Sequence, residues 1–200
     1  MRGSHPTPNA TSGPILAGGH ARRFAGRDKS ALLVEGRTIL ARQIEALAPV
    51  AEPIVVVGPA LVPGATAGAR ALPDLFPGRG PVGGVFTALS QAPGTWVLIV
   101  ACDMPFVATP LLQALVAACA GHDAAVPFAG NRWHPLCACY DVRCAAVARA
   151  HLERDQLRML DLLADLDVAR LDDEALGLHG DPARLLANVN TLDDYERLTQ

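Results

Sequence analysis

The sequence predicts an α/β fold: a mostly parallel central sheet with helices on both faces. Short apolar runs alternate with helical patterns along the 200 residues, which is the signature of an α/β domain. The runs Ile54–Val57 and Trp96–Ala101 are apolar throughout, as expected for strands buried on both sides. No internal repeat or low-complexity linker interrupts the pattern. We therefore expect a single domain over residues 13–200, preceded by a disordered leader or tag remnant over residues 1–12.

The first expected strand is Pro14–Ala17, which stops at Gly18-Gly19 because two successive glycines disfavour a strand. A loop rich in Gly and Arg follows and runs to Lys29. Thr38 is a good N-cap for the first helix, which Pro49 ends.

Later elements follow from the same signals of caps, prolines and apolar runs. In order, we expect a strand at 54–57, a short strand near 70–72, a helix from 80 to about 91 with Pro81 in its first turn, a strand at 96–101, a helix to Ala120 capped by Thr109, strands at 123–128 and 135–140, helices at 142–154 and 156–166, and a last helix capped by Thr191.

Composition excludes several classes of protein. Half of the residues are hydrophobic and 18% are charged, which excludes a disordered chain. The net charge of −3 provides no overall basic footprint for nucleic acid or an anionic membrane. Apolar runs fall far short of the roughly 20 residues of a membrane span. Five cysteines without a signal segment predict reduced thiols and a cytoplasmic protein.

The turn after the first strand is the first candidate site, because ligands bind at the carboxyl ends of strands in open parallel sheets. Glycines in the turn Leu16–Gly19 let backbone N–H groups approach a phosphate closely. Arg22, Arg23 and Lys29, the only lysine, follow in the same loop and predict a cationic cradle. The glycine spacing fits neither a dinucleotide-binding motif nor a P-loop. A plain connecting turn remains the alternative.

Asp103 is the second candidate, since it lies in the segment Cys102-Asp-Met-Pro105 that ends the apolar strand at 96–101. A carboxylate there suits Mg²⁺, which binds one or two carboxylates together with substrate phosphates and water. The alternative is an aspartate that serves only the turn. Asp74 lies in a loop rich in Pro and Gly and indicates little by itself.

Taken together, these segments resemble the motifs of the molybdenum cofactor guanylyltransferases, in order and spacing, from residue 13 onward. The matching segments are Leu16–Lys29, Thr38-Ile-Leu, Pro73-Asp74, Gly80-Pro-Val-Gly-Gly84, Ala101-Cys-Asp-Met-Pro105 and Asn188-Val-Asn-Thr191. The resemblance implies a Rossmann-like nucleotidyltransferase fold. It also implies transfer of GMP from GTP to the terminal phosphate of molybdopterin, with release of pyrophosphate. Gly58 departs from the family, which often has Asn there.

The resemblance also implies roles for individual residues. Those expected to bind GTP are Leu16, Ala17, Gly18, Gly19, Arg22, Lys29, Asp74 and Asp103. Lys29, Arg23 and Asp103 would be catalytic, with Asp103 as the Mg²⁺ ligand. His134, Asn188 and Asn190 match positions on the side of the pterin substrate.

Other readings of the same motifs stay open. One is a cytidylyltransferase for the same pterin, although Ala17-Gly18-Gly19 favours GTP. Another is a sugar- or alditol-phosphate nucleotidyltransferase, and a third is a GTP-binding cofactor chaperone without catalysis. Expected partners are GTP, molybdopterin and, transiently, molybdoenzymes or their chaperones; neither nucleic acid nor a membrane is expected. Cys137, Cys139 and Cys144 are expected to be buried small side chains rather than metal ligands.

Overall fold

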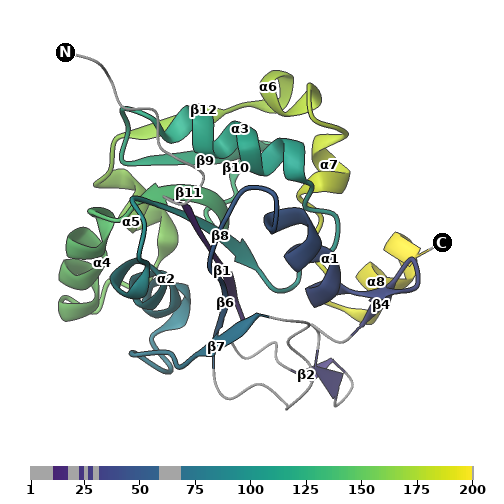
Figure 1. Ribbon diagram of the computed structural model, residues 1–200, viewed down its shortest axis with the longest axis horizontal. Helices are drawn as coiled ribbons and strands as arrows, with labels where there is room; N and C mark the ends of the chain where they lie inside the picture. The colour runs from purple at the N-terminus through teal and green to yellow at the C-terminus, as the bar shows by residue number, and fades with distance from the viewer. Residues whose placement is uncertain (1–10, 18–22, 25–26, 29–31, 59–68, 200) are drawn as a thin grey trace.

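A computed structural model describes residues 11–17, 23–24, 27–28, 32–58 and 69–199. Within them, an eight-stranded sheet forms the centre of the molecule (Figure 1). Its strands lie in the order β10-β9-β11-β8-β1-β6-β7, and β12 also pairs with β9. Their bounds are β1 Thr11–Leu16, β6 Ile54–Val57, β7 Arg70–Leu72, β8 Trp96–Ala101, β9 Ala124–Ala129, β10 Arg132–Trp133, β11 Cys137–Asp141 and β12 Val168–Leu171.

The sheet is mostly parallel, as predicted. β1 runs parallel to both β6 and β8, β6 to β7, and β9 to β12. β11 runs antiparallel between β8 and β9, and β10 pairs antiparallel with β9. The carboxyl ends of β7, β6, β1, β8, β9 and β12 therefore share one edge of the sheet, where the first residues of β11 also lie.

Eight helices are described: α1 Ile39–Leu47, α2 Gly80–Gln91, α3 Thr109–Cys119, α4 Cys144–Glu153, α5 Met159–Ala164, α6 Asp173–Gly177, α7 Pro182–Leu185 and α8 Leu192–Thr199. Two short hairpins lie outside the sheet, β2 Arg23–Phe24 with β3 Arg27–Asp28 and β4 Leu33–Val34 with β5 Arg37–Thr38. Glu35 and Gly36 both have positive φ, the backbone that a tight two-residue hairpin turn requires.

Helices cover both faces of the sheet and form a separate core on each (Figure 1). Alternation along β8 sends Leu98 and Val100 toward α1 and α3, and sends Val97 and Ile99 toward α2, α4 and α5. All four side chains are fully buried. Burying a side chain of this size stabilises the fold by about 1.5–3 kcal/mol, so this central strand contributes to both cores.

The structure corrects three expectations. β1 begins at Thr11, so buried Thr11 and Ser12 belong to the sheet and not to the leader expected over residues 1–12. Thr109 does not cap α3: Ala108 is the N-cap, and the Thr109 hydroxyl donates to the carbonyl of Ala46, 2.8 Å away. The sequence analysis did not predict the short elements β2, β3, β4, β5, β10, β12, α6 and α7. None of the described helices is long and apolar enough to cross a membrane.

Candidate functional site

The carboxyl ends of β1 and β8 meet at the point where the strand order reverses. From β1 the chain continues to β6 on one side, while β8 lies on the other. The amide of Cys102 donates to the carbonyl of Leu16 at 3.1 Å, and the amide of Ala17 donates to the carbonyl of Val57 at 2.7 Å. The first bond joins the predicted turn after β1 to the Asp103 turn, and the second joins it to the end of β6. In open α/β sheets such a point is where ligands bind.

Gly58 lies beside this junction, and the structure explains why it is glycine. A Cβ atom at position 58 would lie 2.7 Å from the carbonyl oxygen of Ala17. That oxygen belongs to the backbone and has little freedom to move. An Asn side chain, frequent here in the resembling family, would therefore require the Ala17 turn to shift.

Asp103 sits in the turn that follows β8, and its side chain is half-buried. The amide of Val189 donates to the Asp103 carbonyl at 2.8 Å. This bond brings the C-terminal segment Asn188–Asn190 against the turn. Asn188 is half-buried and Asn190 is exposed. Two of the three predicted pterin-side residues thus flank Val189, whose amide contacts the Asp103 turn.

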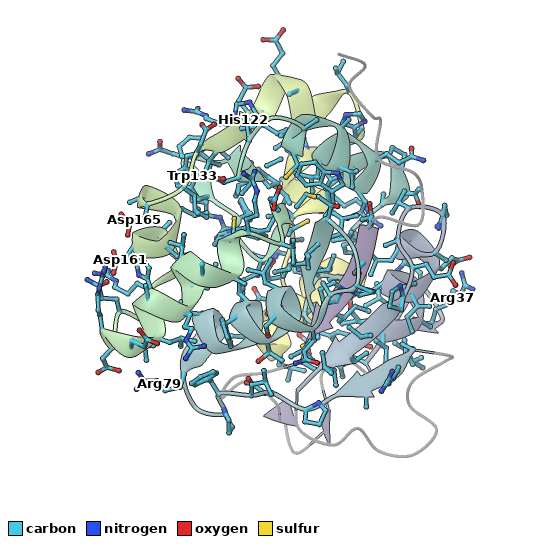
Figure 2. All side chains as sticks on the ribbon, turned by 60° about the vertical axis from the view of Figure 1, so that its left-hand side comes forward. Arg37, Arg79, His122, Trp133, Asp161 and Asp165 are labelled. Atoms are coloured by element: carbon cyan, nitrogen blue, oxygen red, sulfur yellow. The ribbon has the colours of Figure 1, made fainter. Side chains whose placement is uncertain are left out.

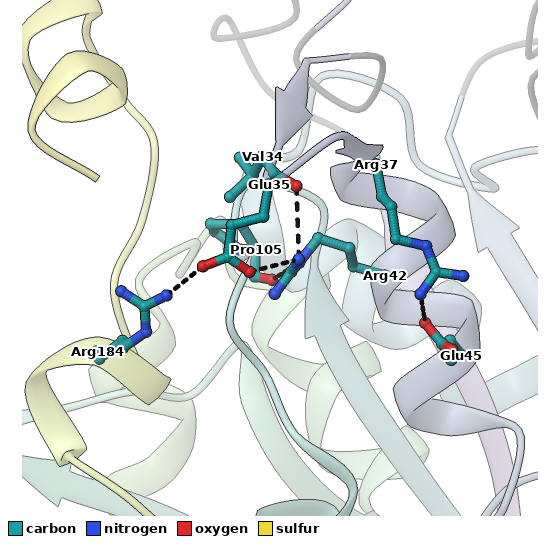
Figure 3. A network of polar contacts seen from close by, with 7 residues as sticks. All are labelled: Val34, Glu35, Arg37, Arg42, Glu45, Pro105 and Arg184. Atoms are coloured by element: carbon teal, nitrogen blue, oxygen red, sulfur yellow. Dashed lines mark hydrogen bonds and ion pairs between the residues drawn. The ribbon is translucent and has the colours of Figure 1, made fainter. Parts of the chain in front are cut away.

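Charged side chains hold the far end of the same turn (Figure 3). The guanidinium of Arg42 donates to the carbonyl of Pro105 at 2.8 Å and pairs with Glu35 at 2.9 Å. Arg184 of α7 pairs with the other oxygen of Glu35 at 2.6 Å. Both guanidinium groups also lie over the ring of Phe106, Arg184 at 3.9 Å and Arg42 at 5.4 Å from its centroid. The β4–β5 hairpin, α1, the Asp103 turn and α7 thus form one connected unit.

Asp74 follows β7, on the same edge of the sheet as Asp103 but three strands away. Three strand spacings of roughly 4.8 Å place these chain positions about 14 Å apart. Such a separation suits the two ends of a nucleoside triphosphate better than one shared atom. Oδ1 of Asp74 accepts hydrogen bonds from the amide of Phe76 at 3.0 Å and the hydroxyl of Thr87 at 2.9 Å. Part of this carboxylate therefore fixes its own loop onto α2.

His134 lies on the other side of the site, in the segment that leads into β11. The neighbouring carbonyl of Leu136 accepts from the amide of Ala101, so this segment adjoins the end of β8. Burial and the nearby charge of Arg132 lower the pKa of His134, against the opposing effects of a hydrogen bond with the Ala129 backbone and the charge of Asp173. His134 is therefore neutral near pH 7 and would contact a substrate as a hydrogen-bonding group.

Trp133, labelled in Figure 2, precedes this histidine on β10. Its ring meets Phe128 edge-on with centroids 5.1 Å apart, and Arg170 of β12 lies 3.9 Å from the centroid of Phe128. These contacts connect β9, β10 and β12 next to the His134 segment.

Several predicted site residues fall outside the described part of the chain. They are Gly18, Gly19, Arg22 and Lys29. Arg23 belongs to β2 by its backbone, and its side chain is likewise outside what the structure describes. Their roles remain predictions.

A divalent cation would have to bind to Asp103 together with substrate phosphates and water. Among the described residues, no group of three or more His, Cys, Asp or Glu side chains is placed to hold a metal ion. Mg²⁺ needs no such group when substrate phosphates and water complete its shell. Asp103 offers one half-buried carboxylate at the ligand-binding edge, which meets that requirement for a metal that arrives with the nucleotide.

Cysteines outside the site behave as small buried side chains. Cys137 and Cys139 share one face of β11 and lie fully buried in the core under α1 and α3. Burial raises the pKa of Cys137 to about 12 and that of Cys144 also to about 12. Both are therefore inert thiols at neutral pH, as expected from the sequence.

Sequence reasoning missed four residues around the Asp103 turn. They are Arg42, Glu35 and Arg184 of the network above, and Gln43 of α1, whose side-chain amide donates to the carbonyls of Ala101 and Met104. Gln43 carried a usable signal, because it is a polar residue in helical register with Ile39 and Leu47 on the buried face of α1. The two arginines carried none, since their partners are 63 and 149 residues away in the chain.

Comparisons with known proteins agree with this geometry. Residues 13–169 match the family model described as MobA-like NTP transferase domain. A probable molybdenum cofactor guanylyltransferase of Pelotomaculum thermopropionicum is 33% identical over 92% of this chain and 89% of its own length. A molybdenum cofactor guanylyltransferase of Desulfosudis oleivorans is 29% identical over 94% of each chain.

A solved structure gives the same assignment. Molybdopterin-guanine dinucleotide biosynthesis protein A of Archaeoglobus fulgidus superimposes with a TM-score of 0.77 at 26% identity, covering 94% of this chain and 96% of that one. The family model spans most of the sheet, including β1, β8 and the Asp103 turn. The chain belongs to the molybdenum cofactor guanylyltransferases, nucleotidyltransferases of the MobA-like NTP transferase family.

Proposed function

We propose that this protein transfers GMP from GTP to the terminal phosphate of molybdopterin, forming molybdopterin guanine dinucleotide and releasing pyrophosphate. The observation that carries the proposal is the junction of the β1 and β8 ends, where the Leu16 turn, Asp103 and the Asn188–Asn190 segment meet. One side of that junction carries the motif that binds GTP in the resembling family. The other carries residues expected on the pterin side.

Catalysis of this reaction depends on positioning the two substrates more than on proton transfer. The attacking group is a phosphate monoester, whose second pKa of about 6 leaves it largely ionised at pH 7. The reaction therefore needs no strong general base, and its main barrier is the approach of two polyanions. A divalent cation, which we propose to be Mg²⁺, would neutralise charge on the triphosphate, and Asp103 is the residue that would hold it.

Other residues take complementary roles. Lys29 would offset charge on the transferring phosphoryl group, and Arg22 and Arg23 would bind the departing pyrophosphate. Backbone groups of Leu16, Ala17, Gly18 and Gly19 would approach the nucleotide, with Asp74 at its guanosine end. Since Oδ1 of Asp74 already accepts two hydrogen bonds, its contact with guanosine would use Oδ2.

His134, Asn188 and Asn190 would face the pterin substrate. Neutral His134 would contribute hydrogen bonding rather than charge. Transient contact with molybdoenzymes or their chaperones would follow from the need to pass the product on. A cytoplasmic location is supported by the free thiols of Cys119, Cys137, Cys139 and Cys144, which a reducing compartment preserves.

The test is a transfer assay with the purified chain, GTP, Mg²⁺ and reduced molybdopterin, following both pyrophosphate and the pterin dinucleotide. Lys29→Ala and Asp103→Asn should each lower turnover by about 10²–10³-fold, the usual cost of one preorganised electrostatic contact. Asp161→Asn, on the exposed surface of α5 (Figure 2), is the matched control and should retain wild-type turnover.

Outcomes of this assay separate the alternatives. Competition between GTP and CTP should yield only the guanine product, whereas a cytosine product would indicate a cytidylyltransferase. Turnover with a sugar or alditol phosphate in place of the pterin would change the proposed acceptor. Tight GTP binding without any turnover would indicate a cofactor chaperone. Wild-type turnover in folded Lys29→Ala and Asp103→Asn would overturn the assigned roles.

A further inference from the structure

Gln43 is a polar residue in an otherwise apolar interface. It lies on the buried face of α1, where its neighbours are Ile39, Leu40 and Leu47, and it is only 1% exposed. Leucine would fill such a position with no polar group to desolvate. A buried amide costs free energy unless its donors and acceptor find partners, so its presence here calls for a specific cause.

Both donors of the Gln43 amide go to the Asp103 turn. Nε2 lies 2.7 Å from the carbonyl oxygen of Ala101 and 3.0 Å from that of Met104. A side-chain NH₂ has two hydrogens, so it donates one to each carbonyl. The inverted amide would turn Oε1 toward two carbonyl oxygens, which excludes that orientation. Gln43 thus bridges the residues immediately before and after Cys102-Asp103.

The bridge made by Gln43 adds little to the stability of the turn and carries a cost in free energy. The carbonyl of Ala101 already accepts from the amide of Met104 at 3.2 Å, so the turn closes without Gln43. Oε1 of Gln43 is buried and has no hydrogen-bond partner among the described residues. An unsatisfied buried acceptor is destabilising. Local arrangements that cost stability are expected where a site needs them.

We propose that Gln43 is a positioning residue that holds the Asp103 turn in a single orientation, so that the Asp103 carboxylate is correctly placed for a divalent cation and GTP. The inference rests on the proposed function of Asp103. Gln43 holds the carbonyls of Ala101 and Met104, and the Val189 amide holds the carbonyl of Asp103 between them, in addition to the bonds that the Ala101 and Cys102 amides make to neighbouring segments. Precision of this kind matters, because a misplacement of about 1 Å costs on the order of 10²-fold in rate.

The test compares Gln43→Met with Thr109→Val. Methionine keeps the length and approximate volume of glutamine and removes both donors. Thr109→Val is the matched control, because it removes another side-chain bond to a carbonyl, the partly buried one between Thr109 of α3 and Ala46 of α1. Gln43→Leu serves as a second variant if Gln43→Met does not fold. Circular dichroism establishes that each variant is folded.

Two measurements test the positioning role of Gln43. In the ligand-free protein, hydrogen exchange at the Met104 amide should accelerate at least about tenfold in Gln43→Met and stay at the wild-type rate in Thr109→Val, because the turn opens locally. In the transfer assay, Gln43→Met should lower kcat/KM by about 10- to 100-fold and raise the Mg²⁺ concentration needed for half-maximal rate. The double variant Gln43→Met/Asp103→Asn should be no slower than Asp103→Asn alone.

Contrary results are distinguishable. If the losses of Gln43→Met and Asp103→Asn multiply in the double variant, Gln43 acts on something other than Asp103, and the inference fails while the proposed function stands. Unchanged exchange at Met104 in Gln43→Met would also overturn it. If Asp103→Asn itself retains wild-type turnover, the role of Asp103 fails, and the positioning role fails with it.

Discussion

Two adjacent glycines of α2 should respond in opposite ways to the same substitution. A Cβ atom at Gly83 would lie 2.8 Å from the carbonyl oxygen of Phe76, and 3.2 Å and 3.3 Å from the Cβ atoms of Arg79 and Phe76. Among the residues that the structure describes, a Cβ atom at Gly84 would meet the Leu16 side chain alone, at 3.6 Å or more, an ordinary contact. Gly83 therefore lets the loop that carries Asp74 pack directly on α2, whereas Gly84 has room for a methyl group.

The magnitude follows from two opposing contributions. Replacing glycine by alanine inside a helix is worth about 0.5–1 kcal/mol in favour of the folded state. Overpacking against backbone costs about 1–3 kcal/mol. Gly84→Ala should therefore be slightly more stable than wild type. Gly83→Ala should be less stable than Gly84→Ala by about 1–3 kcal/mol, because helix propensity cancels in the comparison of the two variants.

Urea denaturation followed by circular dichroism measures this difference, since ΔG falls linearly with urea. In a thermal scan the two variants should differ in Tm by about 2–12 °C, at roughly 2–4 °C per kcal/mol for a chain of this size. Gly83→Ala should also raise the KM for GTP, because it displaces the Asp74 loop. Equal stability of the two alanine variants would refute the close approach of Phe76 to α2 and the reasoning built on it.

Two further predictions concern titratable groups. His134 should titrate below 6.5 by NMR, because burial and the charge of Arg132 lower its pKa. The associated stability is fully present above pH 6.5, the ordinary value, and is lost as the pH falls from there through the lower folded-state pKa, because the unfolded chain binds the proton more readily. His134→Gln should remove this part of the pH dependence measured by urea denaturation, and an identical pH dependence in both proteins would contradict the prediction. Cys137 and Cys144, whose pKa values are raised to about 12, should not react with a disulfide reagent at pH 8 until the protein unfolds. Mass spectrometry locates the labelled thiols, and rapid labelling of either cysteine in the native state would disprove its burial.

Much of the sheet could be predicted because its central strands are short and apolar on both faces. Ile54–Val57 and Trp96–Ala101 have the bounds expected from their composition and flanking residues, and the short strand Arg70–Leu72 also lies where it was expected. The predictions that failed concern features that depend on contacts between residues far apart in the sequence. Thr109 has the right residue type and position for an N-cap, yet its hydroxyl bonds to Ala46 on another helix. β12 lies at the edge beside β9, and its pairing partner is about 40 residues away in the chain.

In the candidate site, too, single residues could be predicted from the sequence, whereas their contacts could not. Asp103 could be predicted as a candidate site residue because it lies just after the most apolar strand, and Asn188 and Asn190 because they match a family motif. Their meeting could not be predicted, since it depends on one bond between the Val189 amide and the Asp103 carbonyl. Gln43 could have been singled out from its helical register with Ile39 and Leu47, but its two carbonyl partners, 58 and 61 residues away in the chain, could not have been predicted.

A crystal structure with GTP and Mg²⁺ bound would test the central claim most directly. We expect the triphosphate at the carboxyl ends of β1 and β8, with the metal bound by Asp103 and phosphate oxygens, the Lys29 ammonium against the phosphates, and guanine toward Asp74. Nucleotide bound at another edge of the sheet, or a metal remote from Asp103, would contradict it.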